Sequence, residues 1–172
     1  LMAWNADATR LPYRMHSEYL RKLFLDNDLA ESRYEVESRP VSLRDIRVPV
    51  FAVSTISDHV APWRSVYKIQ MLIDADITFV LSNGGHNAGI VSPPGHANRH
   101  HQIATHREDE NYVDPDAWQA SAIRREGSWW TCWRDWLMRQ SSSDLVDPPP
   151  MGAPQAGYAT LCAAPGTYVL EP

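Results

Sequence analysis

The chain has 172 residues, of which 44% are hydrophobic, enough for the core of one domain or of a large part of one. Its formal net charge of −5 and the lack of any Lys/Arg block argue against a nucleic-acid-binding protein. No apolar run reaches the roughly 18 residues of a membrane-spanning helix, and no signal peptide is recognisable. Cys132 and Cys162 lie far apart and predict neither a disulfide framework nor a metal motif, so we expect a reduced, cytosolic protein.

The first part of the chain predicts a loop, a helix and a hairpin. Residues 4–12 are rich in small and polar side chains that favour a loop. From about Met15 the apolar residues recur at helical spacing, with charged residues between them. An alternating stretch at 34–37, a turn at 38–40 and a return at 41–43 predict a β-hairpin.

The middle of the chain predicts a βαβ unit. Residues 48–53 and 77–81 are apolar, rich in β-branched side chains and of strand length, and the amphipathic stretch 63–73 lies between them. Pro62 suits the first turn of that helix. Two strands joined in this way lie parallel in one sheet, so the sequence predicts an α/β fold.

Two polar loops follow these strands and hold the best candidate site residues. Asp58 follows the first strand, and His86 follows the second after a double glycine that lets the backbone turn sharply. The carboxyl ends of parallel strands meet at one rim of a sheet, so we expect Asp58 within roughly 3–4 Å of a His86 ring nitrogen. An acid and then a histidine, in this order, are the last two members of an α/β-hydrolase triad.

The rest of the chain predicts two helices and a carboxyl-terminal arm. Residues 96–115 are polar and are expected to form a loop, and a short helix begins at Pro115. Gly127-Ser128 precedes a helix whose tryptophans, at 129, 133 and 136, are expected to pack in the core. Residues 141–150 are rich in serine and proline and predict a linker, and residues 158–172 could form an extended arm.

Each candidate residue also has a plain structural interpretation. Asp58 could cap the following helix, and His86 could be a hydrogen-bonded core histidine. The histidines at 96, 100, 101 and 106 fit no metal-binding spacing, so we expect no metal site. No Gly-x-Ser-x-Gly or Gly-x-Cys-x-Gly motif surrounds Cys132, Cys162 or any serine, so the chain shows two members of a triad without its nucleophile.

Several ordered blocks share their pattern with one enzyme family. The blocks are Trp4-Asn5-Ala6-Asp7-Ala8-Thr9-Arg10-Leu11-Pro12, Phe24-Leu25-Asp26-Asn27-Asp28-Leu29, Asp58-His59-Val60-Ala61-Pro62-Trp63, Gly85-His86-Asn87-Ala88-Gly89-Ile90, Gly127-Ser128-Trp129-Trp130 and Ala164-Pro165-Gly166-Thr167-Tyr168-Val169. Together they resemble the class I poly(3-hydroxyalkanoate) synthases. The likeness covers nearly the whole chain, which begins at Leu1 without an initiator Met and corresponds to about the last third of such a synthase. We therefore expect a fragment without the nucleophile elbow.

The resemblance implies the carboxyl-terminal portion of an α/β-hydrolase fold, a parallel sheet with flanking helices, preceded by the end of a cap. It places the cap in residues 1–33, the hydrolase core in residues 34–140, and a linker with a carboxyl-terminal arm in residues 141–172. The implied reaction transfers 3-hydroxyacyl groups from coenzyme A thioesters to a cysteine and then to a growing polyester. This fragment alone is expected to be inactive, because that cysteine is missing from it.

The resemblance also implies roles for individual residues. His86 matches the base that deprotonates the cysteine, and Asp58 matches the catalytic acid, which either orients His86 or helps to activate the substrate hydroxyl. His59 and Trp4 are expected to line the substrate pocket. No cofactor or metal is implied, since coenzyme A thioester is the substrate.

The implied partners are 3-hydroxyacyl-coenzyme A, the polyester chain, a second copy in the full-length enzyme and the surface of a cytoplasmic storage granule, with no nucleic acid. Two other functions stay open. A serine α/β-hydrolase, such as an esterase or a polyester depolymerase, would place an acid and a histidine on the same strand ends. A non-catalytic fragment that serves assembly or granule binding is the third possibility.

Overall fold

The structure is a computed structural model that describes residues 10–167 of the chain. Its contacts divide the chain into a larger compact unit, Ser17–Ser142, and a smaller one that combines both ends of the chain. The sheet, its covering helices and the candidate site all belong to the larger unit. The boundaries expected at 33/34 and 140/141 stay a prediction.

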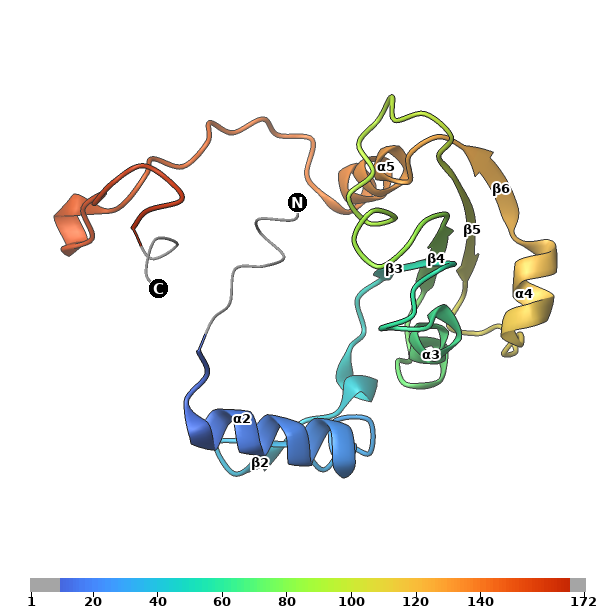
Figure 1. Ribbon diagram of the computed structural model, residues 1–172, viewed down its shortest axis with the longest axis horizontal. Helices are drawn as coiled ribbons and strands as arrows, with labels where there is room; N and C mark the ends of the chain where they lie inside the picture. Colours follow the sequence, from blue (N-terminus) through green and yellow to red (C-terminus); the bar gives the residue numbers. More distant parts are fainter. Residues whose placement is uncertain (1–9, 168–172) are drawn as a thin grey trace. The chain divides into compact units, whose positions relative to one another are not determined.

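A four-stranded sheet with the order β3-β4-β5-β6 forms the centre of the larger unit (Figure 1). β3 (Val50–Thr55) and β4 (Ile77–Ser82) run parallel, with Val50 opposite Ile77 and Thr55 opposite Ser82. β5 (His100–His106) and β6 (Ile123–Glu126) continue the sheet as antiparallel strands. All six residues of β4 are buried, as its continuous apolar and β-branched sequence predicts for a central strand.

The α/β fold with flanking helices is confirmed, but two details of the expected sheet are wrong. The sheet is mixed, because only the β3–β4 pair is parallel. The supposed loop at 96–115 contains β5, of which six residues, His101–His106, pair along β4. β5 has three histidines and a glutamine among its residues, so its sequence lacks the apolar alternation that marks a strand. Its pairing with β4, a tertiary contact, decides its conformation.

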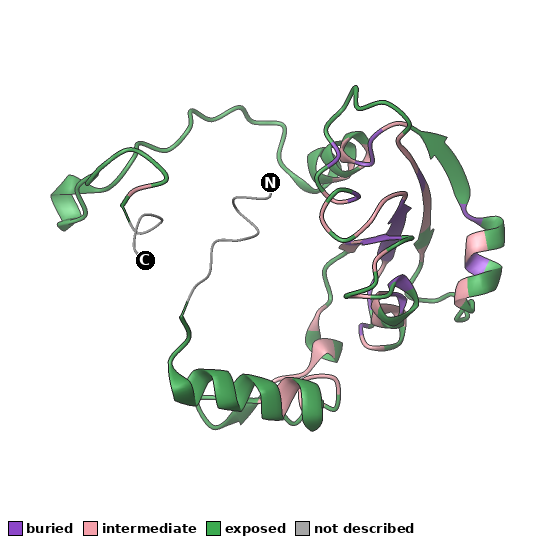
Figure 2. Ribbon diagram, in the orientation of Figure 1, coloured by how far each residue is buried: buried purple, intermediate pink, exposed green. Residues whose placement is uncertain are grey.

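One face of the sheet is covered by α3 (Trp63–Tyr67) and α4 (Pro115–Ser121). Tyr67 contacts Phe79 edge-on with ring centroids 5.1 Å apart, and Phe79 contacts Trp118 at the same distance. These three side chains are at most 5% exposed and form the centre of the core. Figure 2 shows buried positions on the central strands and on parts of the helices beside them. The helix expected over 63–73 is shorter than predicted, because its second half is the 3₁₀ helix η3 (Lys68–Met71).

The expected helix after Ser128 is present as α5 (Trp130–Gln140). Phe51 of β3 contacts the rings of Trp129 and Trp136 with centroids 6.3 and 5.6 Å apart. Neighbouring side chains along a strand point to opposite faces, so Phe51 and its neighbour Ala52, a core residue, lie on opposite faces of the sheet. The core packing expected for the tryptophans holds for Trp129, which is 7% exposed, and less for Trp133, which is 41% exposed.

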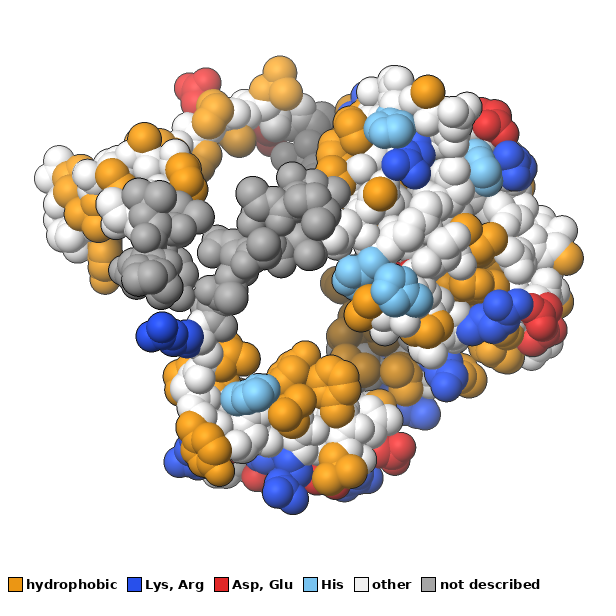
Figure 3. Space-filling model, in the orientation of Figure 1, with side chains coloured by type: hydrophobic (Ala, Val, Ile, Leu, Met, Phe, Trp, Pro, Cys, Tyr) orange, Lys and Arg blue, Asp and Glu red, His pale blue; other side chains and the backbone are white. Residues whose placement is uncertain are grey.

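The segment before the sheet contains the expected helix and a hairpin, but the second hairpin strand lies at 39–40, inside the expected turn, and the expected return at 41–43 is not a strand. The helix consists of α2 (Tyr13–Tyr19) and a π-helical continuation, η1 (Leu20–Leu25). The strands β1 (Glu35–Val36) and β2 (Arg39–Pro40) pair antiparallel, and the 3₁₀ helix η2 (Leu43–Asp45) follows. Neither α2 nor η1 contains a buried residue, and Figure 3 shows hydrophobic side chains gathered on this helical segment.

The segment after α5 contains no helix or strand between residues 141 and 150, as expected for a linker. The 3₁₀ helix η4 (Pro154–Ala156) lies within a turn closed by the pairing of Ala153 with Tyr158. The last five residues of the expected arm lie outside the described part of the chain. Among the described residues, no helix has the length and apolar character needed to cross a bilayer.

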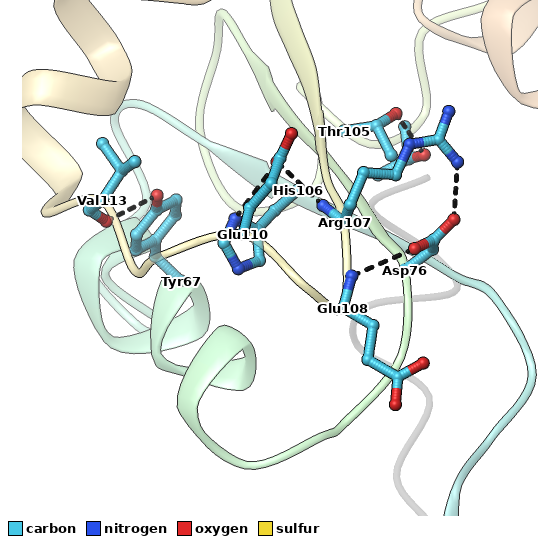
Figure 4. Close-up of polar contacts among 9 residues, drawn as sticks. Tyr67, Asp76, Thr105, His106, Arg107, Glu108, Glu110 and Val113 are labelled. Atoms are coloured by element: carbon cyan, nitrogen blue, oxygen red, sulfur yellow. Dashed lines mark hydrogen bonds and ion pairs between the residues drawn. The ribbon is translucent and has the colours of Figure 1, made fainter.

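A polar cluster joins β4 and β5 at the end of the sheet where β4 begins (Figure 4). Arg107 Nη1 donates a hydrogen bond to Asp76 Oδ2 at 2.6 Å, and the Glu108 N–H donates to Asp76 Oδ1 at 3.1 Å. The Tyr67 hydroxyl donates to the Val113 carbonyl at 2.9 Å and so ties α3 to the chain that leads into α4. The two contacts of Asp76 hold the amino end of β4, whereas the candidate site lies beyond its carboxyl end.

Candidate active site

Asp58 and His86 are placed by the two parallel strands of the sheet. β3 ends at Thr55 and β4 ends at Ser82, and these two residues are direct partners in the register. The loops that follow are also joined, because the Ser57 N–H donates a hydrogen bond to the Gly84 carbonyl at 3.1 Å. An acid three residues beyond β3 and a histidine four residues beyond β4 therefore lie at the same rim.

The two side chains are in direct contact. Nδ1 of His86 lies 2.9 Å from Oδ2 and 3.1 Å from Oδ1 of Asp58. A carboxylate can only accept, so the Nδ1 proton points at Asp58 and Nε2 is left free to take a proton from another group. The expected distance between the pair is confirmed. The Asp58 side chain is 8% exposed and that of His86 is 45% exposed, so the acid is shielded while the imidazole is open to a reactant.

Asp58 is held by backbone hydrogen bonds as well as by His86. The Val60 and Ala61 N–H groups donate to its Oδ1 at 2.9 and 2.8 Å. Burial acts to raise the pKa of Asp58. The hydrogen bonds from Ala61, His86 and Val60 outweigh burial, so the pKa of Asp58 lies below its ordinary value and the group is ionised at neutral pH. The capping interpretation is only partly right, since Asp58 closes a turn before α3, whose N-cap position is Pro62.

The loop that carries His86 depends on glycines at defined places. Gly84 has φ +113°, a conformation that L side chains rarely adopt, and a Cβ there would lie 2.9 Å from Gly89 Cα. Gly89 packs directly on the Thr55 side chain, where a Cβ would overlap the threonine. The Asn83 side chain fixes the start of the loop by donating to the Asn98 carbonyl at 2.9 Å and accepting from the His100 N–H at 3.0 Å.

The two expected pocket residues remain predictions. His59 is exposed beside Asp58, and no hydrogen bond or ion pair of its side chain is recorded in the described part of the chain. Trp4 lies outside the described residues. Across residues 10–167, no group of three or more His, Cys, Asp or Glu side chains could hold a metal ion.

Cys132 has a histidine partner that sequence reasoning missed. Its Sγ lies 3.3 Å from His101 Nε2 and 3.4 Å from Arg125 Nη1, beside a cavity of about 280 Å³. His101 is 1% exposed and its Nδ1 donates to the Gly127 carbonyl at 3.1 Å, so Nε2 accepts from the thiol. Burial lowers the pKa of His101, which disfavours the imidazolium that a general base must become. Cys162, the other cysteine, is exposed.

Comparison with known proteins relates the chain to one enzyme family. No family model matches the chain. The chain is 36% identical over 175 residues to Poly(3-hydroxyalkanoate) polymerase 2 of Ectopseudomonas oleovorans. The matched region covers 99% of the chain and 29% of that protein. It is also 36% identical to Poly(3-hydroxyalkanoate) polymerase of Methylorubrum extorquens (98% and 27%) and to Poly(3-hydroxyalkanoate) polymerase subunit PhaC of Cupriavidus necator (98% and 28%).

The chain thus spans less than a third of the length of these relatives and matches a carboxyl-terminal part of them. The resemblance drawn from the ordered sequence blocks is confirmed. The roles of single residues are a separate question, since these comparisons assign none.

Proposed function

We infer that this chain, which is related to a carboxyl-terminal part of the poly(3-hydroxyalkanoate) polymerases, supplies the acid and the base of an acyltransferase site. The observation that carries the proposal is the contact of 2.9 Å between His86 Nδ1 and the shielded Asp58 carboxylate at the carboxyl ends of two parallel strands. The nucleophile is a cysteine from another part of the polypeptide. The pair then forms the second half of a Cys–His–Asp triad.

The first step of the proposed reaction forms an acyl-enzyme. Nε2 of His86 takes the proton of the cysteine thiol, and the thiolate attacks the carbonyl carbon of a 3-hydroxyacyl-coenzyme A thioester. The carbon–sulfur bond to coenzyme A breaks, and the departing thiolate receives the proton from His86. The imidazole is neutral again and ready for the second step.

The second step extends the polyester. The 3-hydroxyl of another hydroxyacyl group loses its proton to His86 and attacks the acyl-enzyme, so that an ester forms and the cysteine thiolate leaves with that proton. Of the two roles open to Asp58, orientation of His86 fits its surroundings better. Its Oδ1 already accepts two backbone N–H groups and both oxygens face the imidazole, which leaves the 8% exposed carboxylate little access to a substrate hydroxyl.

The proposed substrates are 3-hydroxyacyl-coenzyme A and the growing polyester, with no cofactor. We also propose that the complete enzyme works as a homodimer at the surface of a cytoplasmic storage granule. The chain by itself is proposed to be inactive, because an acid and a base cannot replace the sulfur that carries the acyl group.

The test is release of coenzyme A from a hydroxyacyl thioester by the purified chain, alone and joined to a preceding segment that carries a Gly-x-Cys-x-Gly motif. We expect turnover only with that segment. Asp58→Asn should then lower kcat by about 10³-fold or more, because the imidazole loses its orientation and the partner of its positive form. Steady turnover by the chain alone that His86→Ala abolishes would show that the nucleophile is internal. Unchanged kcat in Asp58→Asn would exclude the triad.

A further inference from the structure

The backbone of the loop that carries His86 is bound by side chains from a distant part of the chain. The indole N–H of Trp129 donates to the Gly89 carbonyl at 3.1 Å, and that of Trp130 donates to the Ile90 carbonyl at 2.9 Å. The Ser128 hydroxyl donates to the Ser92 carbonyl. Three consecutive residues thus hold three carbonyls of one loop, at sequence separations of 36–40 residues.

We propose that Ser128, Trp129 and Trp130, here termed the tryptophan clamp, are positioning residues that hold the His86 loop so that the imidazole meets Asp58. This inference rests on the proposed function, which assigns the base to His86. The clamp is not catalytic, because none of its recorded contacts in the described part of the chain reaches the Asp58 carboxylate or the His86 ring.

The clamped carbonyls belong to a compact turn that includes His86. The Gly89 N–H donates to the Gly85 carbonyl at 2.9 Å, and the Val91 N–H donates to the Asn87 carbonyl at 2.9 Å. Gly85 and Asn87 are the immediate neighbours of His86 in the chain. A shift of the backbone at residues 89–91 therefore acts on both neighbours of the histidine.

Gly89 also connects the clamp to the acid. Trp129 holds its carbonyl from one side, and its Cα packs on the side chain of Thr55, which is fully buried at the end of β3. The Asp58 N–H donates to the Thr55 carbonyl at 3.3 Å. The contact between Gly89 and Thr55 therefore connects the loop of the base, His86, with the loop of the acid, Asp58.

The clamp itself is anchored to the sheet. Trp129 and Ser128 are 7% and 6% exposed, and the Trp129 ring stacks on Phe51 of β3 with an interplanar angle of 28°. The Gly127 N–H donates to the Arg99 carbonyl at 2.6 Å. A buried indole N–H or hydroxyl without an acceptor costs free energy. The loop carbonyls supply acceptors for the donors of the clamp, and the same hydrogen bonds fix the loop.

Positioning matters here because the His86 side chain is 45% exposed and Asp58 is its recorded hydrogen-bond partner. Among residues 10–167, Asp58 is the hydrogen-bond partner that holds the ring, so the place of the ring follows the place of its loop. A misplacement of about 1 Å can cost about 10²-fold in rate.

The test uses Trp129→Phe/Trp130→Phe, which keeps two aromatic rings and removes both N–H donors. Trp136→Phe is the matched control, since it is on the same helix and contacts Phe51, but no indole hydrogen bond is recorded for it among the described residues. Trp130→Phe alone is the second variant, because Trp130 is only half-buried and its loss should leave the fold intact.

Two signals are read by NMR in the unliganded protein, with no turnover needed. One is the titration of the Asp58 carboxyl carbon, and the other is hydrogen exchange of the amides of residues 85–92. In the double variant we expect the Asp58 pKa to move up towards its ordinary value, because part of its lowering comes from His86. We expect about 10-fold faster exchange in the loop. Trp130→Phe should show smaller changes of the same kind, and Trp136→Phe neither.

His86→Gln separates failure of the clamp from failure of the proposed function. If His86→Gln moves the Asp58 titration but the tryptophan variants leave both signals unchanged, the clamp is overturned and the pair stands. If His86→Gln also leaves the Asp58 titration unchanged, the pair that the proposed function requires is absent in solution, and both proposals fall.

Discussion

Asp58 and His86 are held by different means, and this difference decides what could be predicted at the level of single residues. Asp58 is fixed by its own turn, whose N–H groups at Val60 and Ala61 come from the next residues in the chain. Such local bonds have a sequence signature. His86 is fixed through its loop by residues about 40 positions away, and the local sequence does not predict those contacts. The Asp58–His86 pair could therefore be predicted from the sequence, whereas the distant hydrogen bonds that hold the His86 loop could not.

Replacement of both cysteines tests whether the nucleophile lies within this chain. Cys132→Ala and Cys162→Ala together should leave most of the activity of the complete enzyme, because Cys132 is bound to a buried histidine that stays neutral and Cys162 is exposed. Cys132→Ala leaves His101 without its thiol partner, so a small loss of stability is expected. Coenzyme A release is the measurement, and Asp58→Asn is the control that must lose activity. A fall of about 10³-fold in Cys132→Ala, with the fold intact, would identify Cys132 as the nucleophile.

At the scale of elements, sequence reasoning found what local patterns specify. It found β3 and β4, whose apolar residues are continuous, and α4, whose N-cap Asp114 and following Pro115 are typical of a helix start. It missed β5 and β6, since β6 has three charged residues among four and β5 is largely polar. Both strands form because they extend a sheet that already exists, and a single sequence shows little of that long-range pairing.

A glycine substitution tests the contact between the two loops. Gly89→Ala would place a Cβ 2.9 Å from Thr55 Cβ, so we expect a loss of about 1–3 kcal/mol in the free energy of unfolding from overpacking. Gly85→Ala is the matched control in the same loop, because its Cβ would approach nothing closer than the Ser57 carbonyl oxygen at 3.8 Å. Urea unfolding measures both variants. Equal stability of the two would show that Gly89 is not packed against Thr55 in solution.

At the scale of the whole molecule, the two ends of the β3–β4 pair each contain a carboxylate with a lowered pKa. The side-chain hydrogen bond from Arg107 is the main cause for Asp76, and the Glu108 N–H adds to it. For Asp58 the backbone and His86 hydrogen bonds outweigh burial. A carboxyl group whose pKa is lower in the folded than in the unfolded state stabilises the fold above its unfolded pKa, near 4, and loses that effect as the pH falls through the folded pKa.

Acid should therefore destabilise the protein, with the loss beginning below about pH 4. Urea unfolding at a series of pH values from 7 downward measures it. Asp76→Asn should be less stable than the wild type at neutral pH and should lose less on acidification, because one of the two groups no longer titrates. Asp147→Asn, which changes an exposed carboxylate in the extended segment 141–150, should follow the wild-type curve. Identical pH dependence in Asp76→Asn and the wild type would contradict a role for the Asp76–Arg107 pair.

The helical segment η1 exposes large apolar side chains. Phe24 and Leu25 are 70% and 73% exposed, and the Phe24 ring contacts Tyr19, itself 45% exposed, with centroids 5.3 Å apart. Contiguous apolar surface of this kind favours association, so we expect the purified chain to self-associate as its concentration rises. Phe24→Ser/Leu25→Ser should weaken that association in sedimentation velocity. Leu145→Ser, at a fully exposed leucine outside η1, should leave it unchanged. If the wild type is monomeric at every concentration, or if the double variant associates as strongly as the wild type, the apolar surface of η1 does not drive contact between copies.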